Sequence, residues 1–372
     1  MQKLNGSSLQ MISRWDLANK IPIHGQVSFS ELAQQCDICE PDMRRILRYA
    51  MVHHRLFCEP RTGFVAHTRA SRKLKDEPLL RDGLWLLGDM AFQSYPRTID
   101  ALERFKDREP NHSAASLALN TDKSMYDAME GQPAMAARFG GAMASFATFT
   151  SHSSTAPHPT IIDMYPWNSL DDGGLVVDVG GSRGADCVVL AQTYPNLKFV
   201  VQDQTKMIEG AESGIPPTLA GRITFMPYSF FTPQACVADA YLFKQCFHNW
   251  PDHYCVEILK NQIPALKQGA HIIIVDSLVP GPGEMSLLSE KTVRYEIYPH
   301  LMPLSLYFLI NFQRAFDMLM LTNHNGRERE AGDWINIFKQ ADPRFHVTRM
   351  RLLSAPADFG PSQGIIEVAW EG

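Results

Sequence analysis

The chain has 372 residues, of which 45% are hydrophobic and 20% charged, a composition typical of a folded globular protein with two or three domains. Its formal net charge of −5 gives no global electrostatic case for binding nucleic acid or an anionic membrane. No run of about 18 uninterrupted apolar residues occurs, so we expect no membrane span. The N-terminal residues MQKLNGSSLQ lack the apolar core of a signal peptide, and the seven scattered cysteines fit reduced thiols, so we expect a cytoplasmic protein.

Residues 9–70 predict a small helical domain that ends in a β-hairpin. Ser28 or Ser30 is placed to cap a first helix, and residues 40–53 form a second helix with a proline in its first turn. Residues 56–68 are typical of two short strands joined by a glycine-containing turn. Helix, helix and hairpin in this order predict a winged helix.

A winged helix leaves DNA binding open, because Arg44, Arg45 and Arg48 on its second helix could contact phosphates. The same helix also offers apolar side chains to a core, and the chain as a whole is acidic, so we expect no nucleic-acid partner. Cys36 and Cys39 have the spacing of half a zinc site, but no second pair follows them. We therefore expect buried thiols there and no metal.

Residues 78–150 carry methionine, alanine and aromatic residues at helical spacing. Such a stripe is usually part of a core, but it also fits a wall that adapts to an apolar substrate. The candidates for such a wall are Met143, Phe146 and Phe149. Residues 151–172 are rich in serine, proline, histidine and glycine and are interpreted as a linker.

From residue 173 onward strands and helices alternate, which predicts an α/β fold with a Rossmann-like, doubly wound sheet. The last two strands have no helix between them and should form an antiparallel pair at the sheet edge. The predicted strands are 175–179, 198–202, 222–226, 238–244, 271–276, 345–352 and 364–370, and the predicted helices lie near 184–193, 206–212, 253–266 and 331–341. The apolar stretch 280–325 interrupts this pattern and indicates a helical lid or a surface that packs on a second chain. We thus expect a helical domain (1–150), the linker and an α/β domain (173–372).

Residues 175–203 place a glycine turn between two strands of the predicted sheet. The apolar strand 175–179 leads into the turn 180–184, a helix follows, and the next strand ends at Asp203. Backbone N–H groups and a helix N-terminus then lie at the mouth of the turn, and a carboxylate about 20 residues on can accept both hydroxyls of a ribose. The pattern predicts a site for a nucleoside cofactor, with a purely structural turn as the alternative.

Three observations favour S-adenosylmethionine over a nicotinamide or flavin cofactor. The turn reads D-x-G-G-x-x-G, beginning at Asp178, in place of the dinucleotide pattern G-x-G-x-x-G. The unit begins near residue 175, after a long preceding region, whereas dinucleotide-binding enzymes often begin with it. Further on, residues 241–252 form a strand that delivers His248 at its carboxyl end. We therefore expect the cofactor to be S-adenosylmethionine.

Three side chains that can move or hold a proton are expected at the carboxyl edge of this sheet, where open α/β folds bind ligands. His248 follows one strand, Asp276 ends the next, and Glu328 lies in a polar turn. A histidine beside a carboxylate is oriented and made more basic, so it can take a proton from a hydroxyl near neutral pH. Methyl transfer from a sulfonium to a phenol needs this deprotonation and an in-line approach, with no metal. Alone, such a histidine would be interpreted as structural; the two acids and the cofactor turn favour a catalytic base.

The chain resembles the class I S-adenosylmethionine-dependent O-methyltransferases of the caffeate and flavonoid type, in particular their branch in fungal secondary metabolism. The resemblance covers nearly the whole chain, including the winged helix, and HNWPD together with NGRER is its most specific pair of signals. The matching segments are VVDVGGSRG (176–184), FVVQDQ (199–204), SFFTPQ (229–234), the run ADAYLFKQCFHNWPDHYCVEILKNQIPALKQG (238–269), IIIVDS (272–277), DMLML (317–321) and NGRERE (325–330).

The resemblance implies a role for each matching position. His248 would be the general base, flanked by Asp276 and Glu328. The residues implied to hold the cofactor are Gly180, Gly181, Gly184, Asp203, Gln204, Ser229, Phe230, Lys244 and Trp250; the glycines would cradle its methionine end and Asp203 its ribose. Asp317 and Met320 are implied to contact the substrate, an aromatic or polyketide-type small molecule with a hydroxyl group. In this family the winged helix supports a homodimer.

One position departs from the family pattern. Ser229 stands where the family usually has an aspartate that accepts a hydrogen bond from the adenine amino group. Serine is shorter and uncharged, and this loss could cost roughly 1–3 kcal/mol of cofactor binding. The departure keeps a second enzyme class open, because some fungal members of this fold catalyse dehydrations or pericyclic cyclisations and no longer methylate. In such a protein His248 and Lys244 would polarise a carbonyl or assist the loss of water.

Overall fold

The structure, a computed structural model, describes residues 2–152, 160–170, 173–281, 312–353 and 363–372. The chain forms two compact units. The described residues up to 152 and the four residues Leu321–His324 belong to the first unit, and most of the remainder belongs to the second. The predicted lid at 280–325 falls largely outside the described residues. Its later part is the helix α18 (Phe312–His324), which contributes residues to both units.

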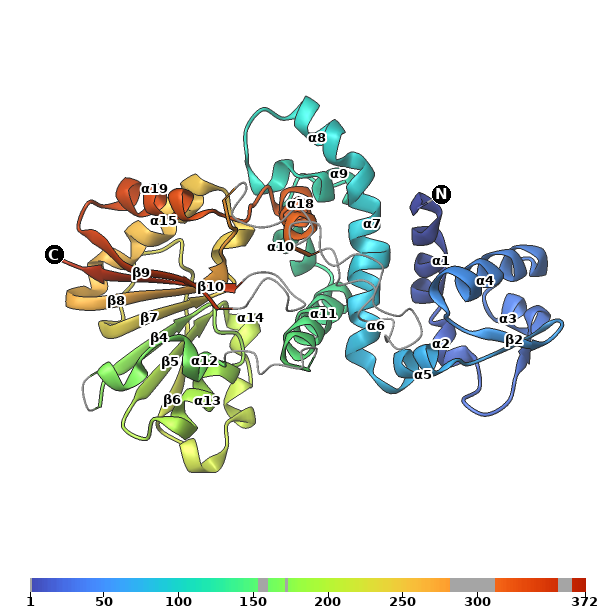
Figure 1. Cartoon of the computed structure of the whole chain (residues 1–372), viewed down its shortest axis with the longest axis horizontal. Helices are drawn as coiled ribbons and strands as arrows, with labels where there is room; N and C mark the ends of the chain where they lie inside the picture. The colour runs from blue at the N-terminus through green and yellow to red at the C-terminus, as the bar shows by residue number, and fades with distance from the viewer. Residues whose placement is uncertain (1, 153–159, 171–172, 282–311, 354–362) are drawn as a thin grey trace. The chain divides into compact units, whose positions relative to one another are not determined.

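The first unit consists of helices and one small sheet of strand order β1-β3-β2 (Figure 1). The strands of this sheet are antiparallel and comprise β1 (Val27–Ser28), β2 (Cys58–Arg61) and β3 (Phe64–Ala66). The helices are α1 (Gln2–Arg14), α2 (Leu17–Lys20), α3 (Phe29–Gln35), α4 (Glu40–His54), α5 (Arg69–Asp76), α6 (Pro78–Trp85), α7 (Ala91–Ser94), α8 (Thr98–Arg104), α9 (Ala114–Leu119), α10 (Met125–Glu130) and α11 (Pro133–His152), with a π-helical turn (Leu86–Met90) between α6 and α7.

Ser28 begins α3 through a reciprocal capping box. Its Oγ accepts a hydrogen bond from the Glu31 backbone N–H at 3.1 Å, and the Glu31 carboxylate accepts one from the Ser28 backbone N–H at 2.9 Å. Of the two predicted caps, Ser28 is confirmed, and Ser30 is wrong because it lies inside the helix. The helix α4, with Pro41 in its first turn, and the β2–β3 hairpin are also confirmed, whereas β1 adds a strand that was not predicted.

The methionine and aromatic stripe of the first unit lies partly in a core. Met125 and Met129 are 1% and 5% exposed and belong to one buried cluster, which confirms the core interpretation for them. Met143, on α11, is 39% exposed. The side chains of Phe146 and Phe149 lie outside those that the structure describes. The role of these three residues as a substrate wall therefore stays a prediction.

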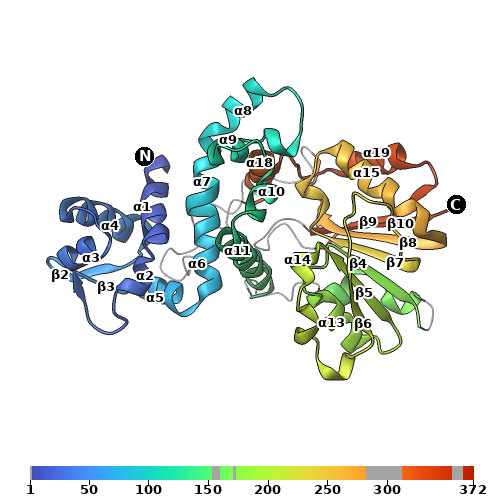
Figure 2. The same cartoon turned by 180° about the vertical axis from the view of Figure 1, so that it is seen from behind.

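The second unit contains a seven-stranded sheet with helices on both faces (Figures 1 and 2). The strand order is β6-β5-β4-β7-β8-β10-β9, in which β6 to β8 are parallel and β10 is antiparallel to both of its neighbours. The strands are β4 (Leu175–Val179), β5 (Lys198–Asp203), β6 (Ile223–Pro227), β7 (Ala238–Lys244), β8 (Leu266–Ser277), β9 (Phe345–Leu352) and β10 (Gln363–Trp370). The helices are α12 (Ile161–Met164), α13 (Ala185–Thr193), α14 (Thr205–Ile208), α15 (Asp252–Gln262) and α19 (Ala331–Ala341).

Alternate residues of the central strands face opposite sides of the sheet. On β7, Tyr241 and Phe243 belong to the same buried cluster as residues of α15 and α19, whereas Leu242 belongs to the cluster that includes α12 and α13. On β4, Val177 and Val176 divide in the same way. Because helices cover both faces, these strands carry apolar side chains on both sides, which explains the mostly continuous apolar runs in the sequence. The doubly wound sheet is confirmed, as is the antiparallel pair at its edge.

Three predicted boundaries in the second unit are wrong. The helix predicted to end at 266 stops at Gln262, because Pro264 turns the chain into a short 3₁₀ segment. The chain then enters β8 directly, so that this strand begins five residues earlier than expected, at Leu266. The helix predicted at 206–212 is only α14, since Gly210 adopts a left-handed backbone with φ +65° and a 3₁₀ turn follows.

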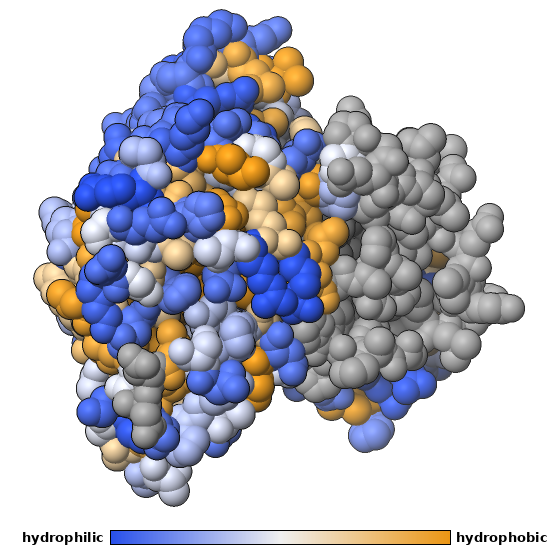
Figure 3. All heavy atoms as spheres, turned by 60° about the vertical axis from the view of Figure 1, so that its left-hand side comes forward, coloured by the Kyte–Doolittle hydropathy of each residue, from blue (hydrophilic) through white to orange (hydrophobic). Residues whose placement is uncertain are grey.

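Hydrophilic and hydrophobic residues are interspersed over the described part of the face that Figure 3 shows. Single exposed apolar side chains of the second unit, such as Val189, Val237 and Ile335, are normal on a folded domain. Among the residues that the structure describes, no helix combines the length and the apolar character needed to cross a membrane.

Candidate active site

The carboxyl ends of the parallel strands meet at one edge of the sheet and bring predicted site residues there. Gly180 follows β4, Asp203 ends β5, and His248 follows β7. Asp276 is the penultimate residue of β8. The chain adds β5 and β6 on one side of β4 and then returns to add β7 on the other, so the strand order reverses beside β4. Doubly wound sheets bind ligands at such a reversal.

The first two residues of the turn after β4, Gly180 and Gly181, leave no room for side chains. Gly180 has φ +78°, and a Cβ there would lie 2.8 Å from the Cys246 Sγ. A Cβ on Gly181 would collide with the Asp178 carboxylate. Gly184, with φ +74°, is the N-cap of α13. The turn can therefore bring a ligand directly against backbone N–H groups and the N-terminus of a helix.

Asp203 lies beside this glycine turn, as the sequence predicted. Its carboxylate accepts hydrogen bonds from the backbone N–H groups of Ser182, at 2.9 Å, and Gln204, at 2.7 Å. Burial raises the pKa of Asp203 above its ordinary value, and the two hydrogen bonds oppose that rise. Each carboxylate oxygen retains acceptor capacity, so Asp203 can also accept hydrogen bonds from two neighbouring hydroxyls.

Lys244, at the end of β7, forms an ion pair with Asp186 in the first turn of α13. The Lys244 Nζ lies 2.7 and 2.9 Å from the two carboxylate oxygens. Asp178 is buried nearby, and burial together with the charge of Asp186 raises the pKa of the Asp178 carboxyl to about 7. Lys244 therefore offsets negative charge next to the glycine turn. Asp186 was not predicted, because no local pattern indicates its distant partner.

Trp250 lies in an aromatic cluster with residues of the loop after β6. Its ring centroid lies 5.9 Å from that of Phe230 and 4.7 Å from that of Phe231, in near-perpendicular arrangements. The structure thus brings two predicted cofactor residues, Phe230 and Trp250, together. Ser229 is exposed, and its Oγ accepts a long hydrogen bond of 3.4 Å from the Phe231 backbone N–H.

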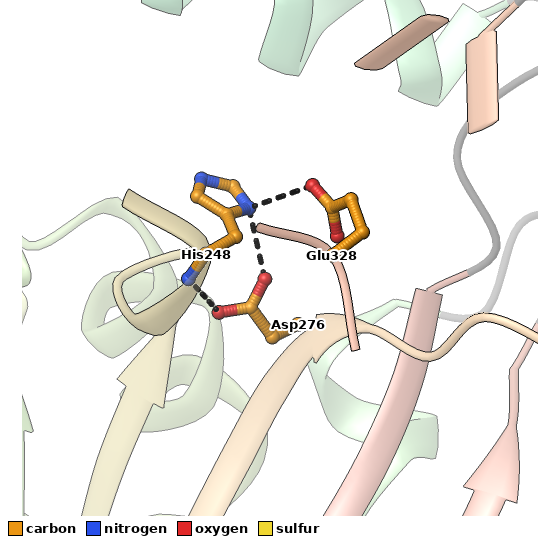
Figure 4. A group of neighbouring side chains, drawn as sticks. All are labelled: His248, Asp276 and Glu328. Carbon is orange, nitrogen blue, oxygen red and sulfur yellow. Dashed lines mark hydrogen bonds and ion pairs between the residues drawn. The ribbon is translucent and has the colours of Figure 1, made fainter. Parts of the chain in front are cut away.

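His248, Asp276 and Glu328 form a buried group (Figure 4). The His248 Nδ1 lies 2.9 Å from Asp276 Oδ1 and 3.5 Å from Glu328 Oε1. The second oxygen of Asp276 accepts hydrogen bonds from the backbone N–H groups of Phe247, at 3.0 Å, and His248, at 3.2 Å. Both acidic side chains are 1% exposed. The structure therefore brings together the three side chains that the sequence proposed for proton transfer.

The charges around His248 make its imidazole more basic than usual. Burial lowers the pKa of His248, but the Asp276 carboxylate, supported by Glu328, outweighs burial and raises that pKa to about 9. Burial raises the pKa of Glu328 to about 7 despite the attraction of His248. For Asp276 the attraction of His248 outweighs burial, and the pKa of this carboxyl is lowered. Asp276 is consequently the ionised partner that orients the ring.

Because Nδ1 faces the two carboxylates, it carries the proton that is donated to Asp276, and in the neutral imidazole Nε2 is left as the acceptor. Figure 4 shows the second ring nitrogen pointing away from both acids. An imidazole held in this way can take a proton from a hydroxyl. The donor atoms of the three side chains lie within 4.8 Å of one another, close enough to hold a metal ion. The hydrogen bond to Asp276 already occupies Nδ1, and we assign no metal.

The helix α18 supplies further contacts to this group. The Phe316 ring stands edge-on to the His248 imidazole, with the centroids 5.5 Å apart, and was not predicted. Asp317, which was predicted to contact the substrate, accepts a hydrogen bond from the Glu328 backbone N–H at 2.9 Å. Met320 is 5% exposed. An aromatic residue inside an amphipathic helix has no local signal that distinguishes a site contact from a core contact, which is why Phe316 was missed.

Comparison with known proteins identifies the family. Residues 120–343, more than half of the chain, match the family model described as an O-methyltransferase domain. The O-methyltransferase pyvH of Aspergillus violaceofuscus is 41% identical over 377 residues, which cover 99% of this chain and 82% of that protein. The grayanic acid biosynthesis cluster O-methyltransferase of Cladonia grayi is 42% identical over 370 residues, which cover 99% of this chain and 72% of that protein.

Solved structures show the same fold at lower identity. OxaC, solved with SAH and oxaline, is 20% identical with a TM-score of 0.76, over 99% of this chain and 85% of that one. LepI, solved in complex with SAM, is 20% identical with a TM-score of 0.70, over 98% of this chain and 86% of that one. The structural neighbours therefore agree on the architecture, and the curated relatives on the enzyme class. The chain belongs to the O-methyltransferase family, whose members use S-adenosylmethionine as the methyl donor.

Proposed function

We propose that the chain methylates a hydroxyl group of an aromatic or polyketide-type secondary metabolite, with His248 as the general base. The observation that carries this proposal is the buried pair of His248 and Asp276, in which Nδ1 faces the acid and Nε2 faces away from it. A hydroxyl held at Nε2 can lose its proton there as its oxygen attacks. The names of the curated relatives support the metabolite class, since one is assigned to grayanic acid biosynthesis.

The residues at the sheet edge fit S-adenosylmethionine, which supplies an electrophilic methyl group when it is bound. Gly180 and Gly181 have no room for side chains, so the turn can receive the amino-acid end of the cofactor against its backbone. The N-terminus of α13 favours a carboxylate there. Asp203 would hold the ribose hydroxyls, and Phe230 and Trp250 offer aromatic surface for the adenine side. Gly184, Gln204, Ser229 and Lys244 would complete this site.

The proton-transfer group would act through its charges. Asp276 holds the imidazole in the tautomer that leaves Nε2 free to accept, and Glu328 adds negative charge beside the same ring. Together they bring the pKa of His248 to about 9, close to the ordinary value of about 10 for a phenol. Proton transfer from a phenol to the neutral form of such a base is nearly balanced, and that form becomes the major one only at alkaline pH. The edge-on Phe316 ring would keep the imidazole in place.

The acid limb of kcat/KM should report this elevated basicity. His248 must be neutral to accept a proton, so kcat/KM should rise with pH through the region of its raised pKa, above the ordinary 6.5. Asp276→Asn removes the charge that most strongly raises this pKa and should move the limb to lower pH, with a smaller loss of turnover than loss of the base. Glu328 and Arg329 also face His248 and are unchanged in this variant. An unshifted limb in pH–rate profiles would contradict the pairing.

Incubation with S-adenosylmethionine carrying a labelled methyl group, over a panel of fungal phenols and pyridones, tests the reaction itself. Labelled product that depends on the chain supports methyl transfer. A pericyclic cyclisation or a dehydration is the second candidate, favoured by Ser229 in place of the family's aspartate and by its exposure in the structure. Conversion of a polyketide-type acceptor without incorporation of label would favour that second reaction over the first.

We also propose a homodimer, with residues 1–150 as the dimerisation domain, 151–172 as the linker and 173–372 as the cofactor-binding catalytic domain. The apolar segment 280–325 would contribute to the interface or close over the site. One feature of the described residues supports an interface: α11 has exposed Ala136, Ala137 and Met143, and Arg138 is the only Lys, Arg, Asp or Glu among its residues.

Sedimentation of the full chain at micromolar concentration should therefore give about twice its 41.9 kDa. An interface that buries a helix face of this kind together with a long apolar segment should be large and obligate, so dilution should not dissociate it readily. A monomer over the whole concentration range would refute the dimer and would leave the winged helix without a proposed role.

The winged helix is proposed to support that dimer and to bind no nucleic acid. Arg44 is ion-paired with Glu40 on the same helix, and the Arg48 guanidinium is 2.7 Å from the Glu59 carboxylate. Arginines whose charge is already balanced by a neighbouring acid attract phosphates weakly. All seven cysteines are free thiols, which supports a reducing compartment such as the cytoplasm. Cys36 is buried, but Cys39 is exposed, so the expectation of buried thiols is wrong for Cys39.

A further inference from the structure

Two segments that carry groups of the proposed proton-transfer site are hydrogen-bonded to each other. The first is Phe247–Trp250, which we call the histidine loop. The second is 325–329, which we call the strap and which carries Glu328. The backbone N–H of Arg327 in the strap donates a hydrogen bond to the carbonyl of His248 at 3.1 Å. The loop that carries the base and the segment that carries the second acid are thus joined directly at the base itself.

The strap is also fixed to the strand that carries the first acid. The Arg329 carbonyl accepts a hydrogen bond of 2.9 Å from the backbone N–H of Val279. Leu278 and Arg329 form an isolated parallel bridge. Leu278 follows Asp276 by two residues, so the strap lies between the continuation of β8 and the histidine loop. One segment therefore links the backbones that position all three side chains of the group.

The side chain of Arg329 holds both ends of the histidine loop. Its guanidinium donates hydrogen bonds to the carbonyl of Phe247 at 2.9 Å and to the carbonyl of Trp250 at 2.6 Å. It is also paired with Asp252, at 2.8 and 3.0 Å, immediately beyond the loop. This side chain is fully buried, with 0% exposure. A planar group with several fixed donors can span these acceptors at once, which the single ammonium of lysine cannot.

Gly326 lets the strap approach the histidine loop closely. A Cβ at this position would collide with the carbonyl oxygen of His248 and lie 2.8 Å from the backbone carbon of Asn249. Backbone atoms cannot give way as the end of a flexible side chain can. A methyl group at Gly326 would therefore have to push the strap and the loop apart.

Glu328 depends on this arrangement for its position. Neither oxygen of its buried carboxylate has a partner in full hydrogen-bond geometry among the described residues, although the Ser277 side chain is near enough to lower the pKa of Glu328. The backbone of Glu328 is held instead, by Asp317 and by the strap contacts on either side. The distance of 3.5 Å between Glu328 and the His248 ring therefore depends mainly on where the backbone of the strap is held.

We propose that Arg329 and Gly326 are positioning residues. By holding the strap against the histidine loop, they fix the position of Glu328 relative to the His248 ring. This proposal rests on the proposed function of His248 as the general base. A displacement of about 1 Å at a reacting group can lower the rate by up to about 10²-fold, so loss of these contacts should lower turnover. Gly326 does not meet the residues proposed to hold the cofactor, so its replacement should preserve cofactor affinity, whereas Arg329 also holds the carbonyl of Trp250 and can affect the cofactor site through it.

Two pairs of matched variants test this role in the full-length protein. Arg329→Lys keeps the charge but loses the span over two carbonyls, and Arg222→Lys is its control. Arg222 also donates hydrogen bonds to three backbone carbonyls of the same unit, but at 191, 194 and 197, away from the histidine loop. Gly326→Ala is paired with Gly332→Ala, a glycine whose Cβ would meet nothing within 4 Å.

We expect Arg329→Lys and Gly326→Ala each to lower kcat about tenfold at saturating cofactor and acceptor, and Gly326→Ala to keep the cofactor Kd within about twofold of the unmutated value. Both controls should retain kcat. An equal loss in the controls, or a retained kcat in both test variants, would overturn the proposal. Should Arg329→Lys fail to fold, Gly326→Ala decides, since it removes no hydrogen bond donor or acceptor of a side chain.

A measurement that needs no activity separates this proposal from the proposed function. In protein with labelled histidine, the His248 resonance, assigned by its loss in His248→Ala, reports the pKa of the imidazole. Gly326→Ala should move this pKa down toward 6.5, because Glu328 is one of the groups that raise it. An unchanged titration would overturn the positioning role even if no acceptor had been found. Full activity of His248→Ala would instead refute the proposed function and leave the titration result standing.

Discussion

Replacing His248 with alanine should lower turnover by about 10²–10⁴-fold, the usual contribution of a positioned proton acceptor. Without the imidazole, a phenolic hydroxyl must lose its proton to water while its ordinary pKa is about 10, so little phenolate is present near neutral pH. Cofactor affinity should barely change, because the base would contact the acceptor and not the sulfonium. The loss should therefore appear in kcat, with the cofactor Kd from calorimetry unaffected.

His271→Ala is a matched control for this experiment. His271 also lies on the large sheet beside a carboxylate, with its Nδ1 3.7 Å from Glu367, but in the middle of β8, five residues before Asp276. Its loss should leave turnover unchanged. Intact methyl transfer by His248→Ala would show that the base is another group. A cyclisation or dehydration that falls when His248 or Lys244 is changed, in the absence of methyl transfer, would favour the second candidate function.

The residues at the ends of strands could be predicted because parallel strands impose a common edge. Once the apolar runs before Gly180, Asp203 and His248 were recognised as parallel strands, their carboxyl ends had to meet. Asp276 could be placed at the same edge because it ends the next apolar run, residues 272–275. These predictions needed only the period of each element and the handedness of the crossovers, which local sequence contains.

The start of α3 could also have been decided from the sequence alone. Ser28 is followed three residues later by Glu31, the pattern of a capping box, whereas Ser30 is followed by Ala33. The structure contains both hydrogen bonds of that box. The position of Glu31 relative to each serine therefore distinguishes the two candidate caps.

The contacts that hold the site together could not be predicted. Arg329 reaches the carbonyl of Phe247, 82 residues earlier in the chain, and Lys244 pairs with Asp186, 58 residues earlier. Nothing in the local pattern around an arginine or an aspartate indicates which distant backbone it will meet. The role of Gly326 could not be predicted either. The sequence around it predicts a turn, whereas the structure shows that the carbonyl of His248 occupies the space that a side chain would need.

Asp203→Ala should weaken S-adenosylmethionine binding by about 10–100-fold, the second large effect expected of a single change. A carboxylate that accepts hydrogen bonds from ribose hydroxyls contributes about 1.5–3 kcal/mol, and 1.4 kcal/mol corresponds to a factor of ten. The carboxylate already holds the backbone N–H groups of Ser182 and Gln204, so it is oriented before the ligand arrives. Titration calorimetry with S-adenosylmethionine and with S-adenosylhomocysteine measures the change directly.

Loss of the backbone contacts must be distinguished from loss of the ribose contact, and Asp239→Ala provides the comparison. Asp239 also accepts a hydrogen bond from a backbone N–H next to β4, that of Leu175 at 2.8 Å, but at the opposite end of the strand. Its loss should disturb the sheet without changing cofactor affinity. Equal affinities for Asp203→Ala and the unmutated protein would remove the ribose assignment. If the unmutated protein itself binds neither ligand, we would attribute the loss of cofactor binding to Ser229. The site should then be tested for cyclisation or dehydration of a polyketide-type substrate.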